Sequence, residues 1–173
     1  MKYLRYGILI LLVFSILSGC GNNDENKEET KQEETKKQSL TVAPGQEKPD
    51  EKRMDELQTK LNELGDAPES RVSFTGVDAK FQDDGSLVIE GFVRNGFDYT
   101  IKNLAGELKV LDNRDNEPIA SEPFTLSEDK FGKLKSGESR LWAFTLKAES
   151  VKNKENDLKN YVVIFDGLTM DQE

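Results

Sequence analysis

The sequence predicts a mainly β protein whose folded part is one small antiparallel sandwich. Between residues 71 and 168, short segments alternate apolar and polar residues, which is typical of strands that bury one face. Runs of Asp, Asn, Ser and Gly separate these segments, and such residues favour turns. The chain has 173 residues, enough for one domain of about 100 residues and further segments before it.

Six strands are expected in this domain. They are Val72–Phe81, Ser86–Arg94, Leu104–Leu111, Pro118–Leu126, Leu141–Lys147 and Tyr161–Phe165. In the fifth, Trp142, Phe144 and Leu146 alternate with small or polar residues and predict one buried face. The sixth is apolar on both faces, which predicts a central strand. Short strands with frequent turns are typical of an immunoglobulin-like or fibronectin-III-like sandwich.

Turns are expected where residues that form local hydrogen bonds gather. The signals are Asp83-Asp84-Gly85, Asn95-Gly96, residues 112–117 and Ser136-Gly137. Asn-Gly between two strands predicts a tight hairpin. Two of these turns are acidic, and clustered carboxylates can bind calcium. Because neither has the spacing of an EF-hand loop, turn formation is the favoured interpretation and no metal site is predicted.

The composition excludes several classes of active site. The chain has no His and one Cys, so it can form neither a Ser-His-Asp nor a Cys-His catalytic site, nor a zinc site with the usual ligands. Its net charge of −9 argues against nucleic acid, which attracts basic surfaces. Paired carboxylates can hydrolyse glycosides, but the acidic residues here lie mostly beside turns or in charged runs. We expect a protein that is not an enzyme and has no cofactor.

The first twenty residues have the pattern of a targeting segment. A short basic region precedes residues 7–17, which are almost wholly apolar. This run is too short to span a bilayer, which requires about 20 apolar residues, and it matches the apolar region of a signal peptide. The following Leu-Ser-Gly-Cys at residues 17–20 resembles the bacterial lipobox. The resemblance implies a signal peptide over residues 1–19, cleavage between Gly19 and Cys20, and acylation of the Cys20 thiol.

Two alternatives to the lipobox stay open: an ordinary secretory signal with a coincidental Cys, and an uncleaved membrane anchor. The lipobox is favoured because the only Cys lies where acylation requires it. Cleavage removes Lys2 and Arg5 and changes the net charge from −9 to −11. The expected location is the outer face of a bacterial cell membrane, with a lipid anchor at Cys20. An anionic membrane repels such a domain beyond its anchor.

Residues 20–53 are expected to be the lipidated Cys and a disordered tether. After Cys20 the composition is mainly Glu, Lys, Asn, Gln and Thr, and only Leu40, Val42 and Ala43 are apolar. Such a segment buries too little surface to offset the entropy of ordering. A flexible coil of this length spans roughly 30 Å and would hold the domain off the membrane. The alternative is a helix with Glu–Lys pairs across residues 25–37.

Residues 54–65 are expected to form a short helix. Four apolar residues recur there at helical spacing: Met54, Leu57, Leu61 and Leu64. Gly65 suits a C-terminal cap, and Pro68 prevents continuation. Because three turns alone are marginal in water, the apolar stripe should pack on the edge of the following domain. The alternative is a coiled-coil contact with a partner, for which the stripe is short.

One long segment and three short ones carry a family resemblance. They are residues 81–104 (FQDDGSLVIEGFVRNGFDYTIKNL), 108–112, 118–124 and 139–144. In this order they resemble the SLAP domain of Gram-positive bacteria, named after accessory-Sec-associated S-layer assembly proteins. The resemblance implies a surface-exposed, non-enzymatic β domain over residues 71–168. Such assembly proteins typically carry the domain in tandem, whereas this chain has one copy, so the resemblance transfers an S-layer role only weakly.

Arg94, Asn95, Asp98 and Tyr99 form the candidate contact loop. Arg94 ends the most strand-like segment, and the other three follow it. The interpretation as a polar contact loop competes with the interpretation as a simple turn. A separate candidate is a sugar-stacking platform of Tyr99, Trp142 and Tyr161. An exposed cluster of these three would favour it, whereas burial of Trp142 would weaken it.

Two functional hypotheses follow. The first is a lipid-anchored module that binds a protein partner in the cell envelope, for example in surface-layer assembly or secretion. The second is a lipoprotein that binds a ligand or a cell-wall polymer. The acidic charge counts against teichoic acid, which is itself anionic.

Overall fold

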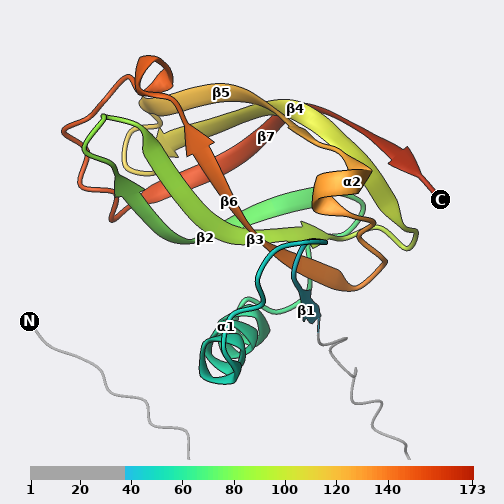
Figure 1. The fold of residues 1–173 in the computed structure, drawn as a ribbon. Helices are drawn as coiled ribbons and strands as arrows, with labels where there is room; N and C mark the ends of the chain where they lie inside the picture. Colours follow the sequence, from blue (N-terminus) through green and yellow to red (C-terminus); the bar gives the residue numbers. More distant parts are fainter. Residues whose placement is uncertain (1–37) are drawn as a thin grey trace, which may run out of the picture. The chain divides into compact units, whose positions relative to one another are not determined.

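Two facing β-sheets and an outer helix make up the computed structural model, which describes residues 38–173 (Figure 1). The strands are β1 (Ser39–Thr41), β2 (Val72–Phe81), β3 (Leu87–Asn95), β4 (Ile101–Asp112), β5 (Pro118–Leu126), β6 (Glu138–Leu146) and β7 (Tyr161–Gln172). The helices are α1 (Glu51–Glu63), α2 (Glu128–Phe131) and the 3-10 turn η1 (Ala148–Ser150). This architecture confirms the predicted mainly β sandwich.

The first sheet has the strand order β1-β6-β3-β2 and the second has the order β5-β4-β7. All the strand pairs are antiparallel except β1–β6, which is parallel. Hairpins join β2 to β3 and β4 to β5. The connections β3–β4, β5–β6 and β6–β7 each cross from one sheet to the other. The predicted strands are all present, and β2 and β5 match residue for residue. The last strand extends well beyond its predicted end, to Gln172.

Aromatic side chains fill the space between the sheets. The ring centroids of Phe74 and Phe144 lie 5.3 Å apart, and those of Phe124 and Phe165 lie 4.9 Å apart. These four rings come from β2, β6, β5 and β7, so each sheet contributes two. Edge-to-face and tilted pairs of this kind add about 0.5–1.5 kcal/mol each beyond the area they bury. The buried face predicted for residues 142–146 is therefore part of this core.

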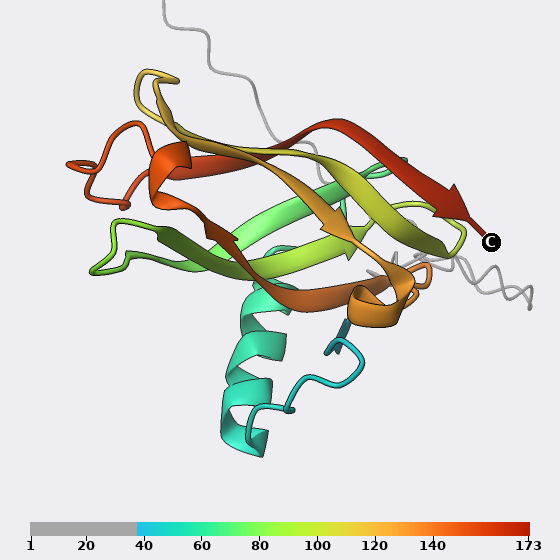
Figure 2. The same ribbon diagram turned by 45° about the horizontal axis from the view of Figure 1, so that its top comes forward.

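Helix α1 packs on the outer face of the first sheet (Figure 2). Leu57 and Leu61 are fully buried there against Phe92 and Leu141. The Asp50 side chain accepts a hydrogen bond from a backbone N–H of the first turn, so the helix begins before the predicted residue 54. Docking on the domain is thus confirmed, on a sheet face rather than an edge. Within residues 38–173 no helix is long and apolar enough to cross a membrane.

The domain begins earlier in the chain than predicted. Residues 20–53 were expected to be disordered, yet β1 and the start of α1 lie inside that range. Gln38 and Ala43 are buried, and β1 pairs with residues 138–140 of β6. The expectation is therefore wrong from residue 38 onward, because tertiary contacts order a segment that has little apolar surface of its own. The part of the predicted tether before residue 38 lies outside the described residues.

Two further expectations are corrected. The sixth predicted strand, now β7, lies at the edge of the second sheet rather than at its centre. Its Ile164 is 42% exposed, so the apolar residues of this strand are not buried on both faces. Asn95-Gly96 does not form a hairpin, since the chain passes there from β3 in one sheet to β4 in the other. Neither residue has the positive φ that a type I′ turn requires.

Candidate functional site

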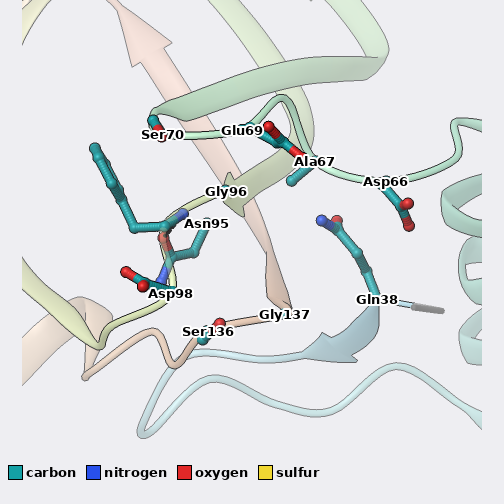
Figure 3. Close-up of a pocket in the computed structure, with 11 residues that line it drawn as sticks. Gln38, Asp66, Ala67, Glu69, Ser70, Asn95, Gly96, Asp98, Ser136 and Gly137 are labelled. Atoms are coloured by element: carbon teal, nitrogen blue, oxygen red, sulfur yellow. Dashed lines mark hydrogen bonds between the residues drawn. The ribbon is translucent and has the colours of Figure 1, made fainter. Parts of the chain in front are cut away.

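Four segments that are distant in sequence enclose a cavity of about 390 Å³ at one end of the sandwich (Figure 3). They are the residue before β1, the α1–β2 loop, the β3–β4 loop and the loop that precedes β6. We call this cavity the acidic pocket. Its lining residues are Gln38, Asp66, Ala67, Glu69, Ser70, Asn95, Gly96, Phe97, Asp98, Ser136 and Gly137.

Gly96 brings two of these loops into direct backbone contact. Its N–H donates to the Arg71 carbonyl (2.9 Å), and its own carbonyl accepts from the Ser70 N–H (2.8 Å). A Cβ atom at residue 96 would lie 1.9 Å from the Pro68 carbonyl oxygen, which no real contact allows. Glycine is therefore required by this close approach, which extends the β2–β3 pairing beyond both strands and forms one wall of the pocket.

Asn95 makes the base of the pocket rigid. Its side chain is 1% exposed, and its amide nitrogen donates to the carbonyls of Tyr99 (2.8 Å) and Leu134 (3.1 Å). Its amide oxygen accepts from the Phe97 N–H at 3.0 Å. All of its hydrogen-bonding groups are thus used inside the protein, and Asn95 positions the β3–β4 loop rather than offering groups to a ligand.

Arg94 is buried below the pocket, although its place in the sequence predicts a contact residue. It is 4% exposed, and its guanidinium donates to the Gln38 side-chain oxygen (3.0 Å) and the Gly65 carbonyl (2.5 Å). Burial lowers the pKa of Arg94, and the nearby Asp66 opposes that shift. Gln38 and the Gly65 carbonyl, which follows helix α1, lie against this side chain, which is why it is unable to reach a partner.

Gln38 connects the start of the described chain to the pocket. It is 7% exposed, and its side-chain oxygen accepts from Arg94 Nε and from the Ser139 hydroxyl. Because a guanidinium only donates, the oxygen must face Arg94, and the amide nitrogen points the other way. Figure 3 shows the side chain reaching toward Ala67 and Asn95. Nothing in residues 38–173 accepts a hydrogen bond from this nitrogen.

The rim of the pocket is acidic. Asp66, Glu69 and Asp98 are side chains from the α1–β2 and β3–β4 loops, and no Lys or Arg lines the cavity. None of the three forms an ion pair with another residue of the described range 38–173. The same part of the chain holds no group of three acidic residues close enough to bind a metal ion. The pocket therefore presents negative charge, and its lining residues form no metal-binding group.

Tyr99, the fourth residue of the predicted contact loop, lies behind the pocket. Its ring stacks on Phe97 with centroids 4.7 Å apart, and its hydroxyl accepts from Gln172 Nε2 at 3.1 Å. The structure thus places Asn95 and Asp98 in the pocket and puts the other two predicted contact residues behind or beneath it.

The three aromatic residues of the sugar-platform hypothesis are separated. Tyr99 lies beside Gln172, the last residue of β7, whereas Tyr161 is its first. A strand of that length spans roughly 36 Å. Trp142 is half-buried and packs edge-on against Phe131 of α2, with centroids 5.4 Å apart. These rings do not form a common stacking surface.

The two acidic turns outside the pocket use their carboxylates for local structure. Asp84 accepts from the Ser86 N–H (2.9 Å) beside Gly85, which has a φ of 81°. Asp112 is buried and accepts hydrogen bonds from Arg114 and Asn156, which hold the pKa of Asp112 well below its usual range. Both turns therefore follow ordinary turn chemistry.

Most of the pocket has no signal in the sequence. Gln38 lies in a polar segment, and the only local sign of order is the nearby apolar trio at residues 40, 42 and 43, which falls in the predicted tether. Asp66 and Glu69 follow the predicted helix and carry no motif. Cys20 and Gly19, the predicted acylation and cleavage residues, lie outside the described residues.

Comparison with known protein families gives one match. Residues 40–167 match the model of the SLAP domain, a non-catalytic family of surface or S-layer modules. No curated protein and no solved structure matches the chain. The match begins in β1 and ends in β7, so it contains the whole pocket except Gln38. It confirms the resemblance predicted from residues 81–144 and extends it in both directions. This chain belongs to the SLAP domain family.

Proposed function

We propose that this chain is a bacterial surface lipoprotein, anchored by acyl chains on Cys20, whose SLAP domain binds a protein partner in envelope assembly or secretion. The family supports a place at the cell surface or envelope, and the lipobox-like residues 17–20 support the anchor. Two acyl chains hold a protein stably on a membrane where one is marginal. Anchoring also raises the local concentration of the module near its partner.

The observation that carries this proposal is the acidic pocket. It is framed by backbone pairing at Gly96 and by the buried Asn95, so its shape is largely formed before a ligand binds. Its rim is charged and its lining holds no nucleophile–base pair, which favours recognition over catalysis. The same charge disfavours an anionic wall polymer, which is the alternative ligand class.

The anchor is tested by replacing Cys20. We expect Cys20→Ala to yield unprocessed or released protein, because the thiol that carries the lipid is gone. Ser15→Ala, in the apolar part of the same segment, should leave processing and membrane retention unchanged. Fractionation of cells and medium measures both. Normal processing and retention of the Cys20 variant would contradict the lipoprotein assignment.

The binding role is tested in living cells with a photo-cross-linking amino acid. Placed at Ser136 in the pocket, it should trap one reproducible membrane or secreted protein, identified by mass spectrometry. Placed at the exposed Glu155, which does not line the pocket, it should not trap that protein. Adducts with wall polymer alone would favour the alternative function, and the absence of any adduct at Ser136 would count against a partner at this site.

A further inference from the structure

We infer that the outer edge of β2 pairs with the same edge of β2 in a second copy of this chain. The two first sheets then join into one antiparallel sheet across a twofold axis, with Phe74 of each copy opposite Phe74 of the other. This inference goes beyond the proposed function, which concerns a different protein as the partner.

β2 is an edge strand. Among residues 38–173 it pairs with β3 on one side and with no strand on the other. The backbone N–H and C=O groups along its outer side are therefore open to another extended chain. When two identical edges pair in antiparallel orientation, each copy uses the same surface, so the contact closes in a dimer and does not extend to further copies.

The register of β2 places Arg71 and Asp78 on the same face of the sheet. In the ladder with β3, Gly76 and Asp78 are consecutive positions, so Val77 is an extra residue in a bulge. Side chains alternate between the two faces of a strand, and Phe74 belongs to the core. Arg71 and Asp78 each lie three ladder positions from Phe74, on opposite sides of it, so both lie on the face away from the core.

The charges along β2 are complementary to themselves. Pairing around Phe74 places Arg71 of each copy opposite Asp78 of the other. Both residues are exposed, and neither forms an ion pair with any residue of the range 38–173. Opposite charges in directly opposed positions of an antiparallel pair are favourable, and like charges are unfavourable. A twofold axis at Thr75 would instead bring Arg71 opposite Lys80, so the charges favour the register centred on Phe74.

Ser73 is an independent observation that points to the same pairing. Its hydroxyl oxygen is the one buried side-chain nitrogen or oxygen without a hydrogen-bond partner among residues 38–173, and such a group is unfavourable. Ser73 as a residue is only half-buried, so it stays open to a neighbour at the edge. The pairing places Thr75 of the second copy directly opposite, with Cβ atoms roughly 4.5–5.5 Å apart, where hydroxyl side chains hydrogen-bond across strands. A second copy thus supplies the missing partner.

A groove of about 540 Å³ beside this edge leaves core side chains partly exposed. It is lined by residues of β2 and of β7, which is the edge strand of the second sheet. Three core-facing side chains of β7 in this groove, Phe165, Leu168 and Met170, are only half-buried. Joining two copies along β2 brings their grooves to the same twofold axis, where apolar side chains of one copy can cover those of the other.

Other occupants fit this edge less well. Residues 21–37 of the same chain contain no apolar side chain, so a strand formed from them would leave the groove exposed. A strand of another protein would have to match both charges of the edge, whereas β2 of a second copy does so by its own sequence. The net charge of −9 on each chain opposes dimerisation. We therefore expect a weak dimer, which anchoring of both copies to one membrane would favour.

The test is sedimentation velocity on residues 20–173 with Cys20→Ser, so that the chain is soluble, from about 10 μM to about 1 mM. The dimer fraction should rise with concentration. Arg71→Asp or Asp78→Arg alone should weaken the dimer at least about tenfold, because each variant places like charges opposite each other at both ends of the paired stretch. An equimolar mixture of the two variants should restore the dimer, because every charge of one variant then faces the opposite charge on the other.

Matched control variants separate the edge from general charge effects. Lys60→Asp and Glu63→Arg make charge changes of the same size on exposed residues of α1 and should leave dimerisation within about twofold. Recovery in the mixture also excludes unfolding as the cause of the loss in the single variants. A monomer at every concentration, an equal loss in the control variants, or no recovery in the mixture would overturn the inference. The cross-link at Ser136 tests the proposed function separately.

Discussion

Replacing Gln38 by Leu should destabilise the domain by about 3 kcal/mol. The change removes the acceptor for the buried Arg94 guanidinium and for the Ser139 hydroxyl, which is fully buried. A hydrogen bond to a charged group contributes roughly 1.5–3 kcal/mol, and a neutral buried donor left without a partner costs about 1 kcal/mol or more. The sum is a large fraction of the stability of an ordinary domain, which is roughly 5–15 kcal/mol.

Urea unfolding measures this loss, with the fluorescence of Trp142 as the probe. This residue is the only Trp, and it packs in the core against Phe131, so its environment changes on unfolding. The melting temperature should fall by about 10 °C, since each kcal/mol shifts a domain of this size by roughly 3–4 °C.

Gln38→Glu is the matched control for this experiment. A carboxylate keeps an acceptor for both Arg94 and Ser139, so this variant should lose less than about 1 kcal/mol. A free energy of unfolding of Gln38→Leu that lies within about 0.5 kcal/mol of that of the unchanged protein would refute the reasoning. That result would mean that the hydrogen bonds of residue 38 do not stabilise the fold.

Three further predictions address the ends of the fold and its charges. A chain that begins at Met54 should unfold at lower urea concentration than one that includes β1, because it lacks the strand paired with β6 and the buried Ala43; equal midpoints would contradict this. Gly96→Ala should destabilise the domain, since its Cβ overlaps the Pro68 carbonyl oxygen; a calorimetric scan measures the loss, and an unchanged melting temperature would contradict it. Because Arg114 holds the pKa of Asp112 below its unfolded value of about 4, the carboxylate stabilises the fold above that pH, and this contribution is lost as pH falls. The stability difference between the protein and Asp112→Asn should therefore shrink between about pH 5 and pH 2, and a constant difference would contradict the assignment.

Local patterns in the sequence are enough to predict the strands of the sandwich and the turn between β2 and β3. Alternation along β2 and β5 is a local pattern with a period of two residues, so it can be recognised without the partner strand. The turn at residues 83–85 follows from Gly85, whose positive φ other residues rarely adopt. The order of the segments in residues 81–144 likewise indicates the SLAP family, because that order is a property of the chain and requires no knowledge of tertiary contacts.

The start of the domain and the residues of the pocket depend instead on contacts between segments that are distant in sequence. A strand as short as β1 has no periodic pattern, and its order comes from pairing with β6 nearly one hundred residues away. Asn95 and Asp98 were predicted in the site, but the burial of Arg94 depends on α1 and Gln38, which cover β3 from distant positions in the chain. Sheet order also placed β7 at an edge, although its apolar pattern favours the centre. Loops that are distant in sequence meet only when the strands between them are paired, and no local pattern encodes that pairing.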